Sequence, residues 1–228
     1  MEPAKTSRAR ARRGAEVQLI RANPATKSTE LAHGRKLTAK AVATRKRIIE
    51  EATDAFAAEG YAAVTVRGIA ESAGVSSGAI YATFRGKAEL LVEAVRTSIA
   101  SDWEDNIPAE IATRPVAEVD AYQFATASTP RRQRLRKLLI EAAVAARTDP
   151  EIATAVGVIL RGRIGVWADE HAKWPSKTTA SHGIDFQALT MLLISIDLGL
   201  GILAALGAET PTPDQLVALI EPLLRTLA

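Results

Sequence analysis

Two short amphipathic segments lie on either side of Gly74, in the stretch TVRGIAESAGVSSGAIYATFRGKAELL (65–91), and they limit the fold more than any other part of the chain. Within each segment the apolar residues recur every three to four positions, which is the helical period. Thr65 and Ser76 stand where helix N-caps are expected, and Gly74 stands at a helix end, where a left-handed residue is commonly needed. Two short helices joined by a tight glycine turn predict a helix-turn-helix over 65–84, whose second helix can enter the major groove of DNA.

A further helix is predicted before this pair. The segment TRKRIIEEATDAFAAEGYAAV (44–64) places apolar residues on one face and ends as a helix at Gly60-Tyr61. Together, residues 44–91 resemble the DNA-binding domain of the tetracycline-repressor (TetR) family of one-component regulators, through AFAAEGY, TVRGIAESAGVSSGAIYATF and GKAELL. The resemblance implies a homodimer with an all-helical ligand-sensing domain after the DNA-binding domain.

The composition agrees with an all-α protein. Of the 228 residues, 47% are hydrophobic but only 4% are aromatic, so Ala and Leu supply the apolar surface, which suits close-packed helices. We predict a disordered basic arm (1–37), a helix-turn-helix DNA-binding domain of three helices (38–86) and a helical ligand-binding and dimerisation domain (87–228). The absence of cysteine excludes disulfides and thiolate chemistry and is compatible with a reducing cytoplasm.

Charge is distributed unevenly along the chain. Residues 1–47 carry 13 Lys and Arg against three acidic residues, a net charge of +10, whereas the rest of the chain has a net charge of −7. A basic end on an otherwise acidic protein is expected of a chain that places this end on nucleic acid. A solvated tail without such a role is the plain alternative, and an organellar presequence is a second one. A secretion signal is not indicated, because the longest apolar run near the N-terminus is Leu19-Ile20.

The remaining helices are predicted from their starts and their periodicity. Thr129-Pro130 and Asp149-Pro150 each place a capping side chain before a proline at the first helical position, and Thr212 with Gln215 has the spacing of a capping box. A polar loop near 173–183 separates two of them. The predicted helices cover 87–100, 116–125, 130–147, 150–172, 185–206 and the segment from 212 to the end.

The segment 185–206 is apolar almost all round. It could span a membrane, but Asp197 near its centre would cost about 3 kcal/mol there. In the family that the chain resembles, the last two helices form a four-helix bundle with those of a second subunit, and Ser195, Gly199 and Gly201 are small enough for close helix approach. The predicted dimer interface comprises Leu193, Ile196, Leu200, Leu203, Leu216, Leu219, Ile220 and Leu223.

By resemblance, Thr65, Arg67, Tyr81 and Lys87 position the DNA backbone, although Tyr81 could instead be a core aromatic. Base reading falls to Ser76, Ser77, Gly78, Ala79 and Thr83. The family often carries larger residues at Ser77 and Ala82, so this recognition helix has little capacity for bidentate base contacts. Three sources of specificity stay open: close groove approach by small residues, DNA shape, or entry of the basic arm into the minor groove. The implied operator is an inverted repeat in double-stranded DNA, and the implied output is repression.

A ligand pocket is expected among the helices over about 100–206. The apolar composition there favours a small hydrophobic effector. Ordinary core packing is the alternative for each residue. Arg161 and Arg163 could meet an anionic head group of the ligand, but they and the run RRQRLRK (131–137) are interpreted as solvated surface. The candidate lining residues are Trp103, Tyr122, Phe124, Ile159, Trp167, Phe186 and Met191.

Signals for an enzyme are absent: the sequence holds no GxSxG, Walker A or HExxH pattern. His33, His171 and His182 are too scattered for a metal site, and no cofactor is predicted. The preferred interpretation is a ligand-responsive regulator in the bacterial cytoplasm, associated with the nucleoid. The alternatives are an architectural DNA binder that relies on the basic arm, and a scaffold or ligand-binding protein whose DNA-binding domain has degenerated.

Overall fold

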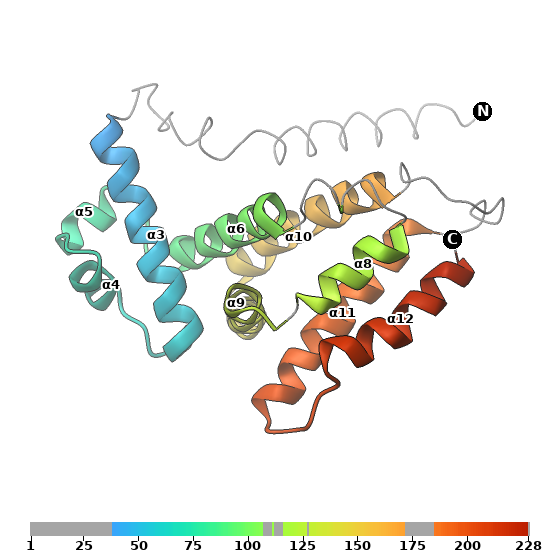
Figure 1. Ribbon diagram of the computed structural model, residues 1–228. Helices are drawn as coiled ribbons and strands as arrows, with labels where there is room; N and C mark the ends of the chain where they lie inside the picture. Colours follow the sequence, from blue (N-terminus) through green and yellow to red (C-terminus); the bar gives the residue numbers. More distant parts are fainter. Residues whose placement is uncertain (1–37, 107–110, 112–115, 127, 172–184, 228) are drawn as a thin grey trace, which may run out of the picture.

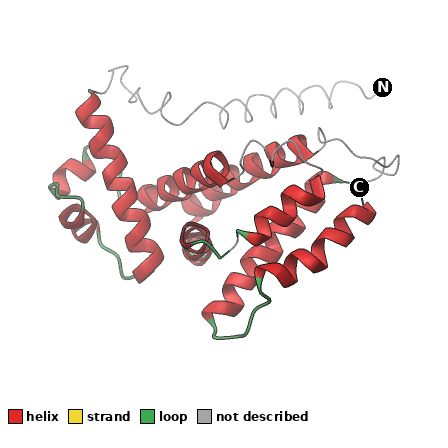
Figure 2. Ribbon diagram, viewed as in Figure 1, coloured by secondary structure: helices red, strands yellow, loops and turns green. Residues whose placement is uncertain are grey.

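The computed structural model describes residues 38–106, 111, 116–126, 128–171 and 185–227, so the predicted basic arm lies outside the described residues. Every regular element in the described part is a helix (Figure 2), and the predicted all-α fold is confirmed. The helices are α3 (Ala39–Glu59), α4 (Val66–Ser72), α5 (Ser77–Tyr81), α6 (Lys87–Asn106), α8 (Val116–Ala125), α9 (Pro130–Ala146), α10 (Pro150–His171), α11 (Phe186–Ala205) and α12 (Pro213–Leu227).

Side-chain caps fix most of the predicted helix starts. The hydroxyl of Thr65 accepts a hydrogen bond from the Gly68 N–H at 3.0 Å, and Asp149 accepts one from the Ile152 N–H at 3.2 Å. The capping box before α12 is reciprocal, since the Thr212 N–H donates to Gln215 and the Gln215 N–H donates to Thr212. Thr129 has the extended backbone of a cap without the side-chain bond.

Two helices are longer than the sequence pattern predicted. Helix α3 begins at Ala39 because Thr38 provides an N-cap, its hydroxyl accepting from the Ala41 N–H at 3.2 Å. Helix α6 continues to Asn106, past the predicted end at residue 100. The extension lengthens α6 at its C-terminal end. This added part carries Asp102, which lines the cavity described below.

The helices fall into two connected parts (Figure 1). Helices α3, α4 and α5 form one end, and α6 leads from them into the second part, where α9 and α10 pack against it. One buried cluster runs through both parts, from Phe56 and Phe84 through Leu90 to Leu138 and Ile152. Because the core is continuous, the first three helices are packed on the second part as well as linked to it.

Helix α12 packs chiefly against α8, and α11 packs against α9 and α10. A separate small cluster of Leu189, Leu193, Leu216 and Ile220 joins α11 and α12. Helix α11 is long and apolar enough to cross a membrane by length and composition, and only 11% of its apolar window is buried within the chain. Asp197 near its centre lies toward α9, with its carboxylate 3.6 Å from Nε of Arg136.

Candidate functional site

The helix-turn-helix is built from local signals and a buried inner face. Ser76 caps α5 by accepting the Ala79 N–H at 3.2 Å, and Gly74 takes the left-handed conformation with φ of 62°. Ile69 on α4, Ile80 on α5 and Phe84 after it are buried. Burial of this face leaves the opposite face of α5 to solvent, where Gly78 and Ala82 are exposed.

The residues expected to meet DNA differ in how free their side chains are. Tyr81 is 59% exposed, so its alternative role as a core aromatic is wrong. Arg67 is exposed, but its Nε lies 2.8 Å from the Glu71 carboxylate, and this hydrogen bond raises the pKa of Arg67. The hydroxyls of Thr65 and Ser76 serve as caps, and Thr83 donates to the Ala79 carbonyl at 3.3 Å. Base or phosphate contacts by these residues and by Ser77 stay predictions.

Lys87 lies at the start of α6, as the sequence predicted, and its ammonium contacts the loop before α4. Its Nζ donates to the carbonyls of Tyr61 at 2.8 Å, Val64 at 3.0 Å and Ala62 at 3.4 Å. The ammonium also lies 4.5 Å from the centroid of the Tyr61 ring, in a cation–π arrangement. Lys87 therefore holds the loop between α3 and α4, and a phosphate contact would have to share this ammonium.

Helix α9 contacts the first part of the molecule directly. Glu141 on α9 accepts the Tyr61 N–H at 2.8 Å, and Arg134 forms an ion pair with Asp54 on α3. The segment 131–137 is therefore not simply a solvated face, as the sequence suggested. Arg134 pairs with Asp54 on α3, whereas Arg132 and Arg136 point in another direction, into the cavity described below. The run of basic residues in the sequence does not show this difference.

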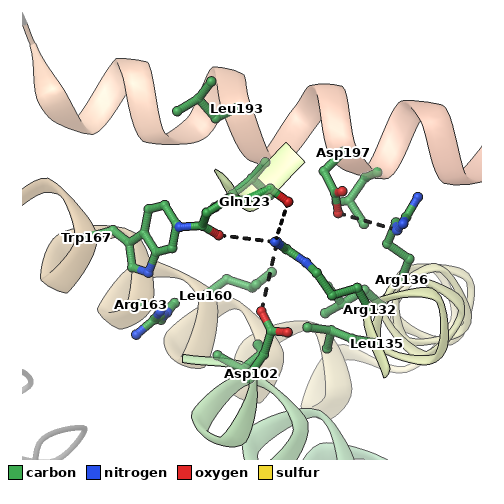
Figure 3. A pocket seen from close by; sticks show the side chains of 14 residues that line it. Asp102, Gln123, Arg132, Leu135, Arg136, Leu160, Arg163, Trp167, Leu193 and Asp197 are labelled. Carbon is green, nitrogen blue, oxygen red and sulfur yellow. Dashed lines mark hydrogen bonds and ion pairs between the residues drawn. The ribbon is translucent and has the colours of Figure 1, made fainter. Parts of the chain in front are cut away.

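A cavity of about 110 Å³ lies among α6, α8, α9, α10 and α11 (Figure 3). Its walls combine leucine and isoleucine side chains with several charged groups. The lining residues are Ile99, Asp102, Gln123, Arg132, Leu135, Arg136, Leu139, Leu160, Arg163, Trp167, Leu193, Ile194, Asp197 and Leu198.

Arg132 is the centre of the polar part of the cavity. One nitrogen of its guanidinium, Nη1, donates to the Gln123 backbone carbonyl at 3.0 Å and to the Gln123 side-chain oxygen at 3.2 Å. The other, Nη2, lies 3.9 Å from Asp102. These contacts connect α6, α8 and α9 at one point, which Figure 3 shows with Arg132 between Gln123 and Asp102.

Burial changes the titration of two other lining groups. Desolvation lowers the pKa of Arg163 to about 9, against the opposing effect of Asp102, so Arg163 is still a cation at neutral pH. Its guanidinium carbon lies 5.4 Å from the Trp167 ring centroid. Desolvation also raises the pKa of Asp197, against the attraction of Arg132 and Arg136. The expectation that Arg163 is solvated surface is wrong.

The predicted pocket residues are mostly elsewhere. Trp167 lines the cavity, but Ile159 is buried in the main core, Phe186 packs on the cluster of α11 and α12, and Met191 is 52% exposed. Tyr122 is half-buried and is not among the residues that line the cavity. The side chains of Trp103 and Phe124 lie outside the described residues. Sequence reasoning chose aromatic residues, whereas the cavity also contains five charged side chains carried by its helices.

The residues predicted for the dimer interface fall into two groups, one buried within the chain and one exposed. Leu193, Leu216 and Ile220 are buried between α11 and α12 of one chain, and Ile196 and Leu200 pack against them. Leu203 and Leu219 are exposed, whereas the side chain of Leu223 lies outside the described residues. Gly201 faces α9, since a Cβ there would lie 3.0 Å from the Arg136 side chain, while a Cβ at Gly199 would meet nothing within 4 Å. Helical periodicity identified an apolar face but could not assign its partner.

A strip of exposed apolar side chains remains on these two helices. Its members are 45–78% exposed, and Ser195 and Gly199 add small residues to the α11 surface. The strip comprises Met191, Leu192, Ile202, Leu203, Leu206 and Leu219.

Comparison with known proteins places the first part of the chain in a family. Residues 48–94 match the bacterial regulatory proteins of the tetR family. The HTH-type transcriptional regulator SrpR of Pseudomonas putida is 47% identical over 57 residues, which are 25% of this chain and 27% of SrpR. The chain thus matches about a quarter of the length of this curated relative.

Solved structures extend the similarity to most of the chain. A TetR-family regulator from Rhodococcus sp. superposes with a TM-score of 0.69 at 16% identity, covering 81% of this chain and 97% of that one. A transcriptional regulator from Saccharomonospora viridis, solved in complex with choline, gives a TM-score of 0.62 at 20% identity, covering 80% and 95%. At these identities the likeness concerns the fold, whereas the sequence match concerns the DNA-binding domain. Residues 48–94 therefore carry a region characteristic of the tetR family of bacterial regulatory proteins.

Proposed function

We propose that this protein is a DNA-binding transcriptional regulator of the bacterial cytoplasm that binds an inverted-repeat operator as a homodimer and is released from it by a small molecule. The proposal rests on one observation: the same chain contains an exposed recognition helix, α5, and a second group of helices that encloses an amphipathic cavity. Helix α5 presents Gly78, Tyr81 and Ala82 to solvent, and α9 contacts both the cavity and the end of α3.

The exposed strip on α11 and α12 supports a homodimer. An apolar strip of this kind on a soluble chain marks an interaction surface. Ser195 and Gly199 add small residues on the α11 surface, so a second copy of α11 could approach closely. A two-fold dimer would present two recognition helices to successive major grooves, which is the geometry that an inverted repeat requires.

The cavity supports control by a small molecule. It lies among helices that also contact the DNA-binding part, and the Saccharomonospora viridis protein of the same fold was solved with choline bound. A ligand that fits only one arrangement of these helices would shift the population between operator-binding and released forms. Repression follows from the family resemblance and is part of the proposal.

The test is selection of bound fragments from the source genome by the purified full-length protein at about 150 mM salt, where screening is physiological. We expect enrichment of a short inverted repeat. A matched pair of variants checks the surface used: Gly78→Glu adds an acid on exposed α5, where a Cβ would lie 3.7 Å from Oγ of Ser76, and Gly165→Glu adds one on α10, where a Cβ would meet nothing within 4 Å. Gly78→Glu should abolish enrichment and Gly165→Glu should preserve it. Equal behaviour of the two variants would contradict the assigned surface.

An architectural DNA-binding protein is the second candidate. It is favoured by the small side chains at Ser77 and Ala82 and by the pairing of Arg67 with Glu71, which leave α5 with little capacity for base contacts. Uniform recovery of fragments would support this candidate. Deletion of residues 1–37 should then remove most DNA affinity and reduce the log–log salt slope by about 0.9 for each lost phosphate contact.

A further inference from the structure

The cavity contains polar atoms that the described part of the chain leaves unsatisfied. Oδ1 of Asp102 and Nε2 of Gln123 are buried, and neither has a hydrogen-bond partner among the described residues. Gln123 as a whole is only 6% exposed. Buried polar groups in native proteins are nearly always paired, so each exception calls for an explanation. One of these atoms is an acceptor and the other is a donor.

Arg132 fixes which atom of each side chain is left over. Its Nη1 donates to Oε1 of Gln123 at 3.2 Å, and a guanidinium can only donate, so the amide oxygen must face Arg132 and the amide nitrogen must face elsewhere. On the other side, Oδ2 of Asp102 lies 3.9 Å from Nη2, which leaves Oδ1 as the spare oxygen. A donor and an acceptor are thus held on two sides of one guanidinium, as Figure 3 shows.

The rest of the cavity sets the size and character of an occupant. Leu135, Leu139, Leu160 and Leu193 form apolar walls beside the Trp167 ring. The volume of about 110 Å³ is somewhat below that of an engineered apolar cavity of about 150 Å³ that holds benzene. An occupant within these walls therefore has an apolar body of about one small ring or a short branched chain.

The charges in the cavity argue for a neutral head group. Arg132, Arg136 and Arg163 face Asp102 and Asp197 in the described lining. A ligand carboxylate has no proton to donate to the spare oxygen of Asp102, and a ligand ammonium has no lone pair to accept from Nε2 of Gln123. A neutral group that donates to Asp102 and accepts from Gln123 would satisfy both atoms and leave the existing pairs unchanged.

We propose that the cavity binds a small uncharged amphipathic molecule whose head group both donates and accepts a hydrogen bond, namely a carboxamide or a hydroxyl. Its donor would face Oδ1 of Asp102, its acceptor would face Nε2 of Gln123, and its apolar body would lie along the leucine walls. That this molecule is also the effector that releases the protein from DNA rests on the proposed regulatory function. The binding chemistry follows from the cavity.

The experiment compares probes that share one ring. Benzamide and benzyl alcohol carry the required head group, toluene has none, benzoate is anionic and benzylamine is cationic. Calorimetry on the full-length protein should show benzamide or benzyl alcohol binding about tenfold more tightly than the other three, since a site built for hydrogen bonds rejects analogues that lack them. Equal or tighter binding of toluene, benzoate or benzylamine would overturn the proposal, and so would failure of all five probes to bind.

A conservative substitution assigns the preference to the cavity. Gln123→Glu keeps an oxygen for Arg132 but replaces the spare donor by an acceptor. Benzamide and toluene should therefore bind this variant with about the same affinity. Gln133→Glu makes the same chemical change on the exposed face of α9 and should keep the preference. Both variants are checked for an unchanged circular dichroism spectrum. An unchanged preference in Gln123→Glu would reject this site.

The genome selection described above separates this proposal from the proposed function. Probe binding is measured without DNA, so a chain that prefers benzamide but enriches no operator would retain the site and lose the regulatory function. A chain that enriches an operator but shows no preference among the probes would retain the function and lose the proposed ligand class.

Discussion

The carboxylate of Glu141 accepts the backbone N–H of Tyr61 at 2.8 Å, which ties the end of α3 to α9. The same carboxylate would lie 3.1 Å from a Cβ on Gly60, whose φ of 84° already favours glycine. Arg132 and Arg136 on this helix line the cavity. Helix α9 therefore contacts both the cavity and the part of the chain that carries α5, and the contact at Tyr61 is open to direct measurement.

Glu141→Ala should destabilise the protein, because it leaves the partly buried N–H of Tyr61 without its acceptor. We expect the free energy of unfolding to fall by about 1–3 kcal/mol, the usual cost of a lost bond to a charged group. Chemical denaturation followed by circular dichroism measures this change. Glu141→Gln keeps an acceptor oxygen and should lose less, and Glu59→Ala, at an exposed site on α3, should stay within about 0.5 kcal/mol of the parent. Similar losses in Glu141→Ala and Glu59→Ala would contradict the assignment.

Three glycines provide a graded test of the same junction. Gly60 combines positive φ with the close Glu141 carboxylate, Gly74 has φ of 62° with open space around a Cβ, and Gly86 has open space without positive φ. Alanine should therefore be most destabilising at Gly60, intermediate at Gly74, by about 1–2 kcal/mol, and nearly neutral at Gly86. Thermal unfolding ranks the three variants. If Gly60→Ala is as stable as Gly86→Ala, the Glu141 carboxylate can move away from the new Cβ without lowering the stability of the protein.

The sequence predicted the structure correctly where a feature depends on one residue and its near neighbours in the chain. Thr65, Ser76 and Gly74 give the helix-turn-helix because a cap or a left-handed turn depends on a few adjacent backbone groups. Asp149 and the pair Thr212 and Gln215 predicted helix starts for the same reason. Buried Ile80 and Phe84 likewise followed from helical periodicity.

The cavity could not be predicted in this way, because its character depends on which helices meet. Asp102, Gln123 and Arg132 come from three helices, and nothing in their local spacing shows that they converge. Leu193 and Leu203 have the same apolar character along α11, yet one faces α12 and the other faces solvent. Tertiary contacts decide such cases, and a helical repeat identifies only the face.

Lys87 offers a test of two roles that the sequence alone did not separate. Its ammonium donates to three loop carbonyls, so Lys87→Met should lower the stability by about 1–3 kcal/mol and weaken DNA binding indirectly. If no phosphate contact is lost, the log–log salt slope of operator binding stays as in the parent. A slope smaller by about 0.9 would instead assign a phosphate contact to Lys87. Fluorescence anisotropy at several salt concentrations decides between these results, with Lys137→Met at an exposed site on α9 as control.

The proposed homodimer predicts a specific effect of charge on the exposed strip. Leu203 is 47% exposed and Leu219 is 63% exposed, so an arginine at either site fits the isolated chain but would be buried in the paired form. Leu203→Arg and Leu219→Arg should sediment as monomers and lose operator affinity. Val144→Arg, at a 54% exposed site on α9, should remain a dimer. Dimers in both leucine variants would place the interface elsewhere.

Asp197 predicts a pH dependence of stability with a definite sign. Burial raises its pKa above the ordinary value of 3.8, so the folded protein holds this proton at pH values where the unfolded chain has released it. Stability from this group is therefore complete below pH 3.8 and is lost as the pH rises through the raised pKa. Asp197→Asn removes the titration, so its free energy of unfolding relative to the parent should rise across that interval and level off above it. Denaturation of both proteins between about pH 3 and 8 measures the difference. A difference that is flat across this range, or that falls with rising pH, would show that the attraction of Arg136 outweighs the desolvation of Asp197.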